Sequence, residues 1–70
     1  MTKAYYTLCV WDTEHAAWFD VFGSYERGEV VEEMQSWKDA GNKAKHLAII
    51  KTDETADAMM KARDALPAPK

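Results

Sequence analysis

The chain has 70 residues, of which 47% are hydrophobic, 11% aromatic and 30% charged, a profile typical of a small globular domain. Nine lysines and arginines against twelve aspartates and glutamates give a formal net charge of −3, which excludes a polybasic nucleic-acid or lipid binder. A single cysteine cannot close a disulfide within the chain, and no apolar run is long enough for a membrane span or a signal peptide. We therefore expect a soluble cytoplasmic protein with no membrane contact and no cofactor.

Two strands are predicted at the start of the chain. Residues 4–11 alternate in parity and are rich in aromatic and β-branched side chains, and residues 18–22 show a similar pattern after a polar break. If the two strands form a hairpin with Trp11 opposite Trp18, every cross-strand pair shares a face. This register also pairs Val10 with Phe19, Cys9 with Asp20, Leu8 with Val21 and Thr7 with Phe22.

The residues after the second strand predict an amphipathic helix. Its apolar stripe has spacings of one, three and four residues and consists of Val30, Val31, Met34 and Trp37. Ser24 or Glu26 is placed to cap its start. Gly41 fits its end, where a positive φ angle is usually required. Gly28 in the first turn is expected to cost about 1 kcal/mol relative to alanine.

A third strand and a second helix are predicted in the last third of the chain. The strand covers residues 45–51, with Leu47 and Ile49 on one side and His46, Ala48 and Ile50 on the other. Thr52 or Asp53 is expected to cap the helix, because both residue types are favoured at that position. The helical stripe consists of Ala56, Met59, Met60 and Leu66, and Pro67 ends it.

The order of these elements predicts an α+β fold. A right-handed crossover from the second strand through the first helix places the third strand beside the first. We expect a two-layer ββαβα sandwich, with a three-stranded antiparallel sheet in the order 3-1-2 and both helices on one face. Residues 1–66 would form one domain, and residues 67–70 a flexible tail.

Two helices on one face would leave the other face of the sheet bare and strongly apolar. We assign Asp20 to the bare face, because burying an unpaired carboxylate costs on the order of several kcal/mol. Such a patch exceeds the few hundred Å² that monomers usually expose, and tryptophan and tyrosine dominate binding surfaces. We predict a partner-binding face that contains Tyr5, Trp11, Trp18, Asp20, Phe22, His46 and Ile50. The alternatives are that the two faces are exchanged, or that the C-terminal helix crosses to this side and closes a three-layer core.

The first predicted helix is acidic on its exposed side. Glu26, Glu29, Glu32 and Glu33 form this acidic surface. An acidic strip of this kind imitates a nucleic-acid backbone when it occupies a basic cleft on another protein. The alternative is an ordinary solvated helix face, which a net charge of −3 also fits.

Catalytic, metal-binding and nucleic-acid-binding interpretations have weaker support. Cys9, Asp20 and His46 share a predicted face, but nothing in the sequence supplies an oxyanion hole, and a lone strand cysteine is usually a small buried apolar residue. Asp12, Glu14 and His15 on one turn do not make a closed metal site. The aromatic face could stack on single-stranded nucleic acid beside Lys43, Lys45 and Lys51, but the net negative charge does not favour this.

The layout of the chain resembles small accessory proteins encoded by bacteriophages. The resemblance covers residues 5–52, with the strands YYTLCVWD and WFDVFGSY and the acidic helix leading to HLAIIKT. Some such proteins inhibit bacterial defence, anti-CRISPR proteins among them. The resemblance implies a non-enzymatic, stoichiometric inhibitor that blocks a host protein complex by occupying a surface. A homodimer packed sheet to sheet, with its acidic helices outward as nucleic-acid mimics, is the alternative.

Overall fold

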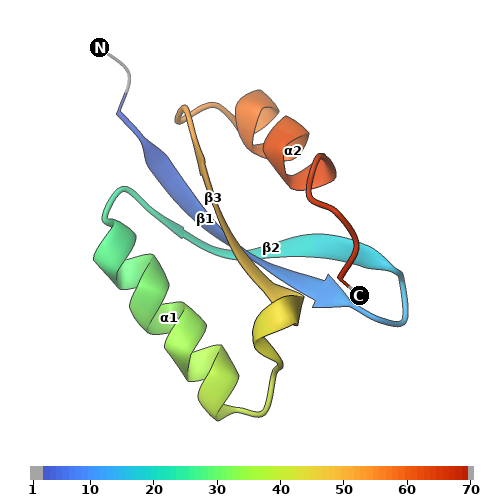
Figure 1. Cartoon of the computed structure of the whole chain (residues 1–70). Coiled ribbons are helices and arrows are strands. Elements are labelled where there is room, and N and C mark those ends of the chain that lie inside the picture. The colour runs from blue at the N-terminus through green and yellow to red at the C-terminus, as the bar shows by residue number, and fades with distance from the viewer. Residues whose placement is uncertain (1–2, 70) are drawn as a thin grey trace.

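A computed structural model describes residues 3–69. Along the chain it contains β1 (Tyr5–Asp12), β2 (Ala17–Ser24), α1 (Arg27–Asp39), a 3-10 turn η1 (Ala44–His46), β3 (Leu47–Thr52) and α2 (Ala56–Asp64). The strands form one antiparallel sheet in the order β2-β1-β3 (Figure 1). The α+β class and the predicted strand order are therefore confirmed.

A β-bulge at Val21 changes the register of the hairpin part-way along β2. Cys9 pairs with Asp20, but the next residue, Leu8, pairs with Phe22, so Val21 has no partner on β1. The predicted pairs before the bulge, Trp11 with Trp18, Val10 with Phe19 and Cys9 with Asp20, are confirmed. The predicted pairs beyond it, Leu8 with Val21 and Thr7 with Phe22, are wrong. The extra residue turns Phe22 to the same face as Leu8.

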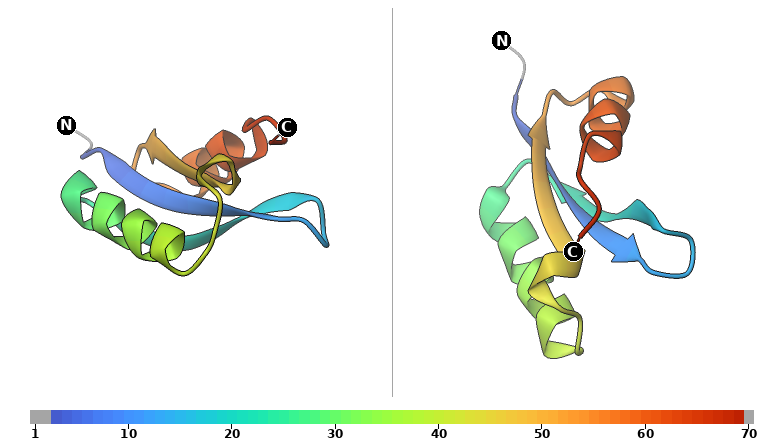
Figure 2. Two further views of the ribbon diagram at one scale, coloured as in Figure 1. Left: turned by 60° about the horizontal axis from the view of Figure 1, so that its bottom comes forward. Right: turned by 45° about the vertical axis from the view of Figure 1, so that its right-hand side comes forward.

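Helices cover both faces of the sheet, so the predicted two-layer arrangement with both helices on one face is wrong. Thr7, Leu8 and Cys9 follow one another in β1 and are 1%, 0% and 0% exposed. Because consecutive strand residues point to opposite faces, both sides of β1 are shielded from water. Figure 2 shows α1 and α2 on opposite sides of the sheet. The structure is the three-layer arrangement that the sequence left as an alternative.

One side chain identifies the face that each helix covers. Arg63 of α2 pairs with Asp20, which lies opposite Cys9, so α2 covers the Cys9 face and α1 covers the Leu8 face. Val30 is the buried residue of α1, at 0% exposure, whereas α2 buries none of its residues to that degree. Core residues lie on both sides of the sheet, with Leu8 and Leu47 beneath α1 and Thr7, Cys9 and Ile50 beneath α2.

The ends of the helices follow local sequence signals in part. Gly41, which follows the C-cap residue Ala40 of α1, has a φ of 105°, as predicted for a helix end. Ser24 Oγ accepts a hydrogen bond from the backbone N–H of Glu26, which is the N-cap residue of α1. The N-cap of α2 is Thr55, whose Oγ1 accepts from the N–H of Ala58, and not the predicted Thr52 or Asp53.

The C-terminal segment beyond α2 contacts the sheet. The indole Nε1 of Trp18 donates to the backbone carbonyl of Pro67 across 3.2 Å. Pro67, the first residue of the predicted tail, is thus held against β2, and residue 70 lies outside the described residues. This contact places the segment beside the end of the hairpin.

Candidate functional site: an aromatic groove at the hairpin end

Two tryptophans form a wall at the end of the β1–β2 hairpin. Trp11 and Trp18 are directly paired across the strands, and their rings meet edge to face with centroids 5.5 Å apart and planes at 68°. Both side chains are half-buried. Figure 2 shows that the turn joining the two strands projects beyond α1, which leaves this end of the sheet uncovered on that side.

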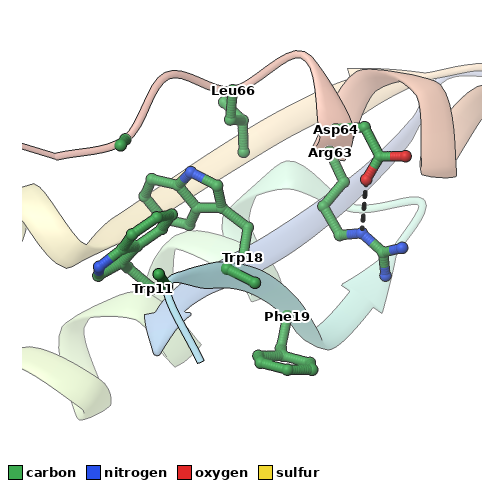
Figure 3. A pocket seen from close by; sticks show the side chains of 9 residues that line it. Trp11, Trp18, Phe19, Arg63, Asp64 and Leu66 are labelled. Atoms are coloured by element: carbon green, nitrogen blue, oxygen red, sulfur yellow. Dashed lines mark ion pairs between the residues drawn. The ribbon is translucent and has the colours of Figure 1, made fainter. Parts of the chain in front are cut away.

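A groove lies between the hairpin end and the C-terminal segment (Figure 3). Its volume is about 460 Å³, within the range of small-molecule and side-chain pockets. The lining residues are Trp11, Ala16, Ala17, Trp18, Phe19, Arg63, Asp64, Leu66 and Ala68.

The apolar side chains that face one another across this groove are Trp11, Trp18 and Leu66, and Figure 3 shows Leu66 above the two indoles. Phe19 borders the groove through its position in β2, but its ring lies on the other side of the strand. There the ring meets His15 edge to face at 5.9 Å and is 45% exposed. The hairpin end therefore has an aromatic side chain on each face, and the groove belongs to the tryptophan side.

Ion pairs hold the polar side of the groove. The guanidinium of Arg63 lies 2.7 Å from an Asp20 carboxylate oxygen, and its Nε lies 3.7 Å from Asp64. The Arg63 side chain is 22% exposed and that of Asp20 40%, so the shorter pair is partly shielded from solvent. It satisfies the carboxylate that the sequence analysis had assigned to a bare face.

The turn beside the groove is closed by Asp12. Its carboxylate accepts from the backbone N–H groups of Glu14 and His15 and pairs with His15 Nδ1 at 3.0 Å. These hydrogen bonds, that from the His15 side chain most of all, hold the pKa of Asp12 below its usual 3.8. Ala16 completes the turn with a φ of 51°.

The acidic pair and the histidine on this turn lie close together. The ligand-type atoms of Asp12, Glu14 and His15 are all within 4.8 Å of one another. Glu14 and His15 are exposed, and the Asp12 carboxylate is engaged by the turn itself. This arrangement is accounted for by turn geometry, as the sequence analysis expected.

Tyr5 belongs to the opposite end of the Cys9 face from the tryptophans. Its ring meets Tyr25 edge to face at 5.0 Å, and it lies over Gly23 so closely that a Cβ there would come within 2.8 Å of Tyr5 Cε2. Tyr5 is thus fixed by side chains of its own chain. Pairing across the bulge then separates it from Phe22, which lies on the other face.

The remaining residues of the predicted partner-binding face are also dispersed. Ile50 is 7% exposed and lies in the core between β3 and α2. His46 belongs to η1 and not to β3, so strand parity does not place it on that face. The predicted partner-binding face is therefore not one continuous surface. Helix α2 covers Ile50, the bulge turns Phe22 to the other face, and His46 lies in η1. The predicted set was Tyr5, Trp11, Trp18, Asp20, Phe22, His46 and Ile50.

The Cys9 thiol lacks the properties of a nucleophile. Cys9 is 0% exposed, and burial, with a smaller contribution from the Asp20 charge, raises its pKa to about 11. At neutral pH the thiol is therefore protonated. With His46 in η1, the predicted set of Cys9, Asp20 and His46 is not assembled as the strand pattern required.

The acidic surface of α1 lies on the other layer of the molecule. Glu26, Glu29 and Glu32 are exposed, while Glu33 is half-buried beside Trp37. Val31, which is 39% exposed, interrupts the charges. Because α1 and α2 lie on opposite faces, this surface and the aromatic groove face different directions (Figure 2).

Sequence reasoning missed the groove residues of α2 and beyond. The predicted site residues include neither Arg63 nor Leu66, and Leu66 enters only through the apolar stripe of the second helix. One signal was available, since Met59 and Arg63 are four residues apart and therefore lie on the same side of a helix. Phe19, which the register pairs with Val10, lies at the projecting hairpin end and is exposed.

Comparisons with protein-family models, curated proteins and solved structures gave no match. Within residues 3–69, neither helix is long and apolar enough to cross a membrane. The function is therefore argued from the groove itself.

Proposed function

We propose that this chain is a non-enzymatic protein-binding module whose contact surface is the aromatic groove at the hairpin end. The observation that supports this is the paired wall of Trp11 and Trp18 beside an open cavity of about 460 Å³. Tryptophan is among the residue types most enriched in side chains that dominate binding energy. A groove with an aromatic wall on one side and Leu66 on the other accepts an apolar side chain of a partner.

Charge around the groove indicates what accompanies that apolar side chain. Asp12, Glu14, Asp20 and Asp64 lie on or beside the groove, and Arg63 is its positive group. The chain as a whole carries a formal charge of −3. A partner segment with an apolar anchor next to lysine or arginine complements this surface, and a cation over a tryptophan face adds attraction.

Such a module acts by occupancy and needs no turnover. The resemblance to small phage proteins supports a stoichiometric inhibitor, and the partner we propose is a protein of a host bacterial complex. Sheet-to-sheet homodimerisation receives less support, because α1 and α2 occupy the two faces it would use. The structure also disfavours stacking of nucleic-acid bases on the predicted aromatic face. Phe22 lies on the opposite face of the sheet from Tyr5, Trp11 and Trp18.

The test is capture of a partner from a bacterial lysate with wild-type and variant baits. Trp11→Ala and Leu66→Ala each remove one side of the groove. Phe19→Ala is the matched control, because it removes an exposed aromatic ring from the same hairpin end but from the other face. Loss of a dominant contact costs at least about 2 kcal/mol, or roughly 30-fold in Kd.

Two outcomes decide the proposal. Capture by wild type and Phe19→Ala, with loss in Trp11→Ala and Leu66→Ala, supports the groove as the binding surface. A partner retained equally by all four baits contradicts it. Trp18→Ala is a poorer test, because removing the indole also breaks its hydrogen bond to Pro67 and loosens the groove wall.

The acidic surface of α1 is a second candidate contact. Glu29 and Glu32 of α1 and its N-cap residue Glu26 are exposed, and the first turn of the helix also contains Arg27. Charge reversal at Glu29, Glu32 and Glu33 should weaken binding to a basic cleft, and the loss should be largest at low salt. Unchanged capture by this triple variant would restrict the function to the groove.

A further inference from the structure

The α2 segment contacts the rest of the chain through side chains that are only partly shielded from solvent. The 9-residue helix packs on β3 and β2 without burying any residue completely. Links between this segment and the sheet include Arg63 with Asp20 at 2.7 Å and, just beyond the helix, Pro67 with Trp18 at 3.2 Å. Before the helix, Tyr25 donates to Glu54 at 3.0 Å. A helix of this length is not stable alone in water, so it loses its structure when it leaves the sheet.

The face beneath α2 contains a polar group, the Thr7 hydroxyl, that gains no hydrogen bond when α2 covers it. Thr7 is 1% exposed, and its buried hydroxyl has no hydrogen-bond partner among residues 3–69. An unpaired buried hydroxyl loses its water without compensation. When α2 moves away from the sheet, the Thr7 hydroxyl can bind water again. This favours local opening of α2 at a lower free energy than unfolding of the whole domain.

We propose that residues 53–69 exchange between two copies of the chain, so that the α2 of a second copy covers the Cys9 face of the first. The face and α2 are complementary in chemistry, because Asp20 needs a cation and the apolar residues Cys9 and Ile50 need an apolar cover. A second copy supplies both with identical geometry. Exchange preserves every contact of the closed cover except those at the hinge, which makes it a low-cost route to a dimer.

The chain geometry at the hinge is compatible with exchange. Residues 53–55 join β3 to α2, and Thr55 has an extended backbone with φ −88° and ψ 144°. The Asp20–Arg63 pair joins residues 43 positions apart, so it reports which copy of α2 covers a given sheet. The inference does not rest on the proposed function, since both closed and exchanged forms contain the groove.

Complementary charge reversal tests the exchange directly. Asp20→Lys alone places a second cation opposite Arg63, and Arg63→Glu alone places a second carboxylate opposite Asp20, so each variant repels its own cover. In an exchanged dimer of the two variants, both pairs become attractive. We expect each variant by itself to be a monomer whose Cys9 thiol reacts roughly five- to tenfold faster than in wild type. An equimolar mixture should form a dimer by light scattering and regain slow thiol labelling.

Several measurements keep the test decisive. Lys61→Gln removes a charge on the outer side of α2, where the Lys61 side chain is 82% exposed, and should change neither labelling nor mass. A mixture that stays monomeric, with labelling at the average of the two separate rates, overturns the proposal. If a variant fails to fold, measurements on the wild-type protein test the proposal instead. Cys9 labelling that depends on urea as steeply as global unfolding, or no dimer after incubation at millimolar concentration, also overturns it.

Discussion

Val30 and Val31 are neighbours in α1, yet Val30 is 0% exposed and Val31 is 39% exposed. The helix turns by about 100° per residue, so the two side chains face the sheet and the solvent respectively. Val30→Ala removes two buried methyl groups and leaves a cavity, and we expect it to lower the free energy of unfolding by roughly 2 kcal/mol. Val31→Ala should change it by less than about 0.5 kcal/mol. Urea denaturation of both variants checks this, and equal effects would contradict the packing of α1 on the sheet.

Two glycines near the ends of α1, Gly28 and Gly41, should respond to alanine in opposite directions. Gly41 has a φ of 105°, which an L-residue adopts only with strain, so Gly41→Ala should destabilise by about 1–2 kcal/mol. Gly28 lies inside the first turn, and a Cβ there meets nothing within 4 Å. Gly28→Ala should therefore stabilise by about 0.4–1 kcal/mol. Thermal unfolding of the pair is the measurement, and loss of stability in Gly28→Ala would mean that this turn is not helical.

The buried thiol makes stability depend on alkaline pH. The pKa of Cys9 is raised from 9.0 to about 11, so the folded state resists ionisation of the thiol. Its contribution is fully present below pH 9 and is lost as the pH rises from about 9 to 11, by an amount on the order of 2 kcal/mol. Cys9→Ala keeps the other titrating groups and serves as the control. The difference in unfolding free energy between wild type and Cys9→Ala should shift against wild type across this interval. A constant difference would show that the thiol is not shielded.

The hairpin turn makes the stability of the fold depend on acidic pH. The pKa of Asp12 is lowered below 3.8, chiefly by the His15 side chain. The resulting stabilisation is present above the usual carboxyl pKa and is lost as the pH falls through the lowered value. NMR titration of the Asp12 carboxyl should show a midpoint below 3.8 in wild type and a higher one in His15→Ala. Glu14→Gln should leave it unchanged, because Glu14 contributes only its backbone N–H.

Much of the secondary structure was predictable because its signals are local. Alternating apolar residues indicated β1, and a positive-φ residue was expected at Gly41. The bulge at Val21 could not be anticipated, since an extra residue in β2 leaves the local composition of a strand unchanged. It is nevertheless decisive for the site, because it removes Phe22 from the face that holds the tryptophans.

The face covered by α2 was decided by tertiary structure alone. Both faces of the sheet are apolar, so a short helix with a modest apolar stripe fits either of them by sequence pattern. The sequence assigned Asp20 to an uncovered face of the sheet because no cation near it in the chain was identified as its partner. Arg63, 43 residues further along the chain, neutralises that carboxylate and lets the Cys9 face be covered. Periodicity along the chain determined which segments are strands and helices, but a charge pair between distant residues determined how they stack, because such pairs form only once the chain is folded.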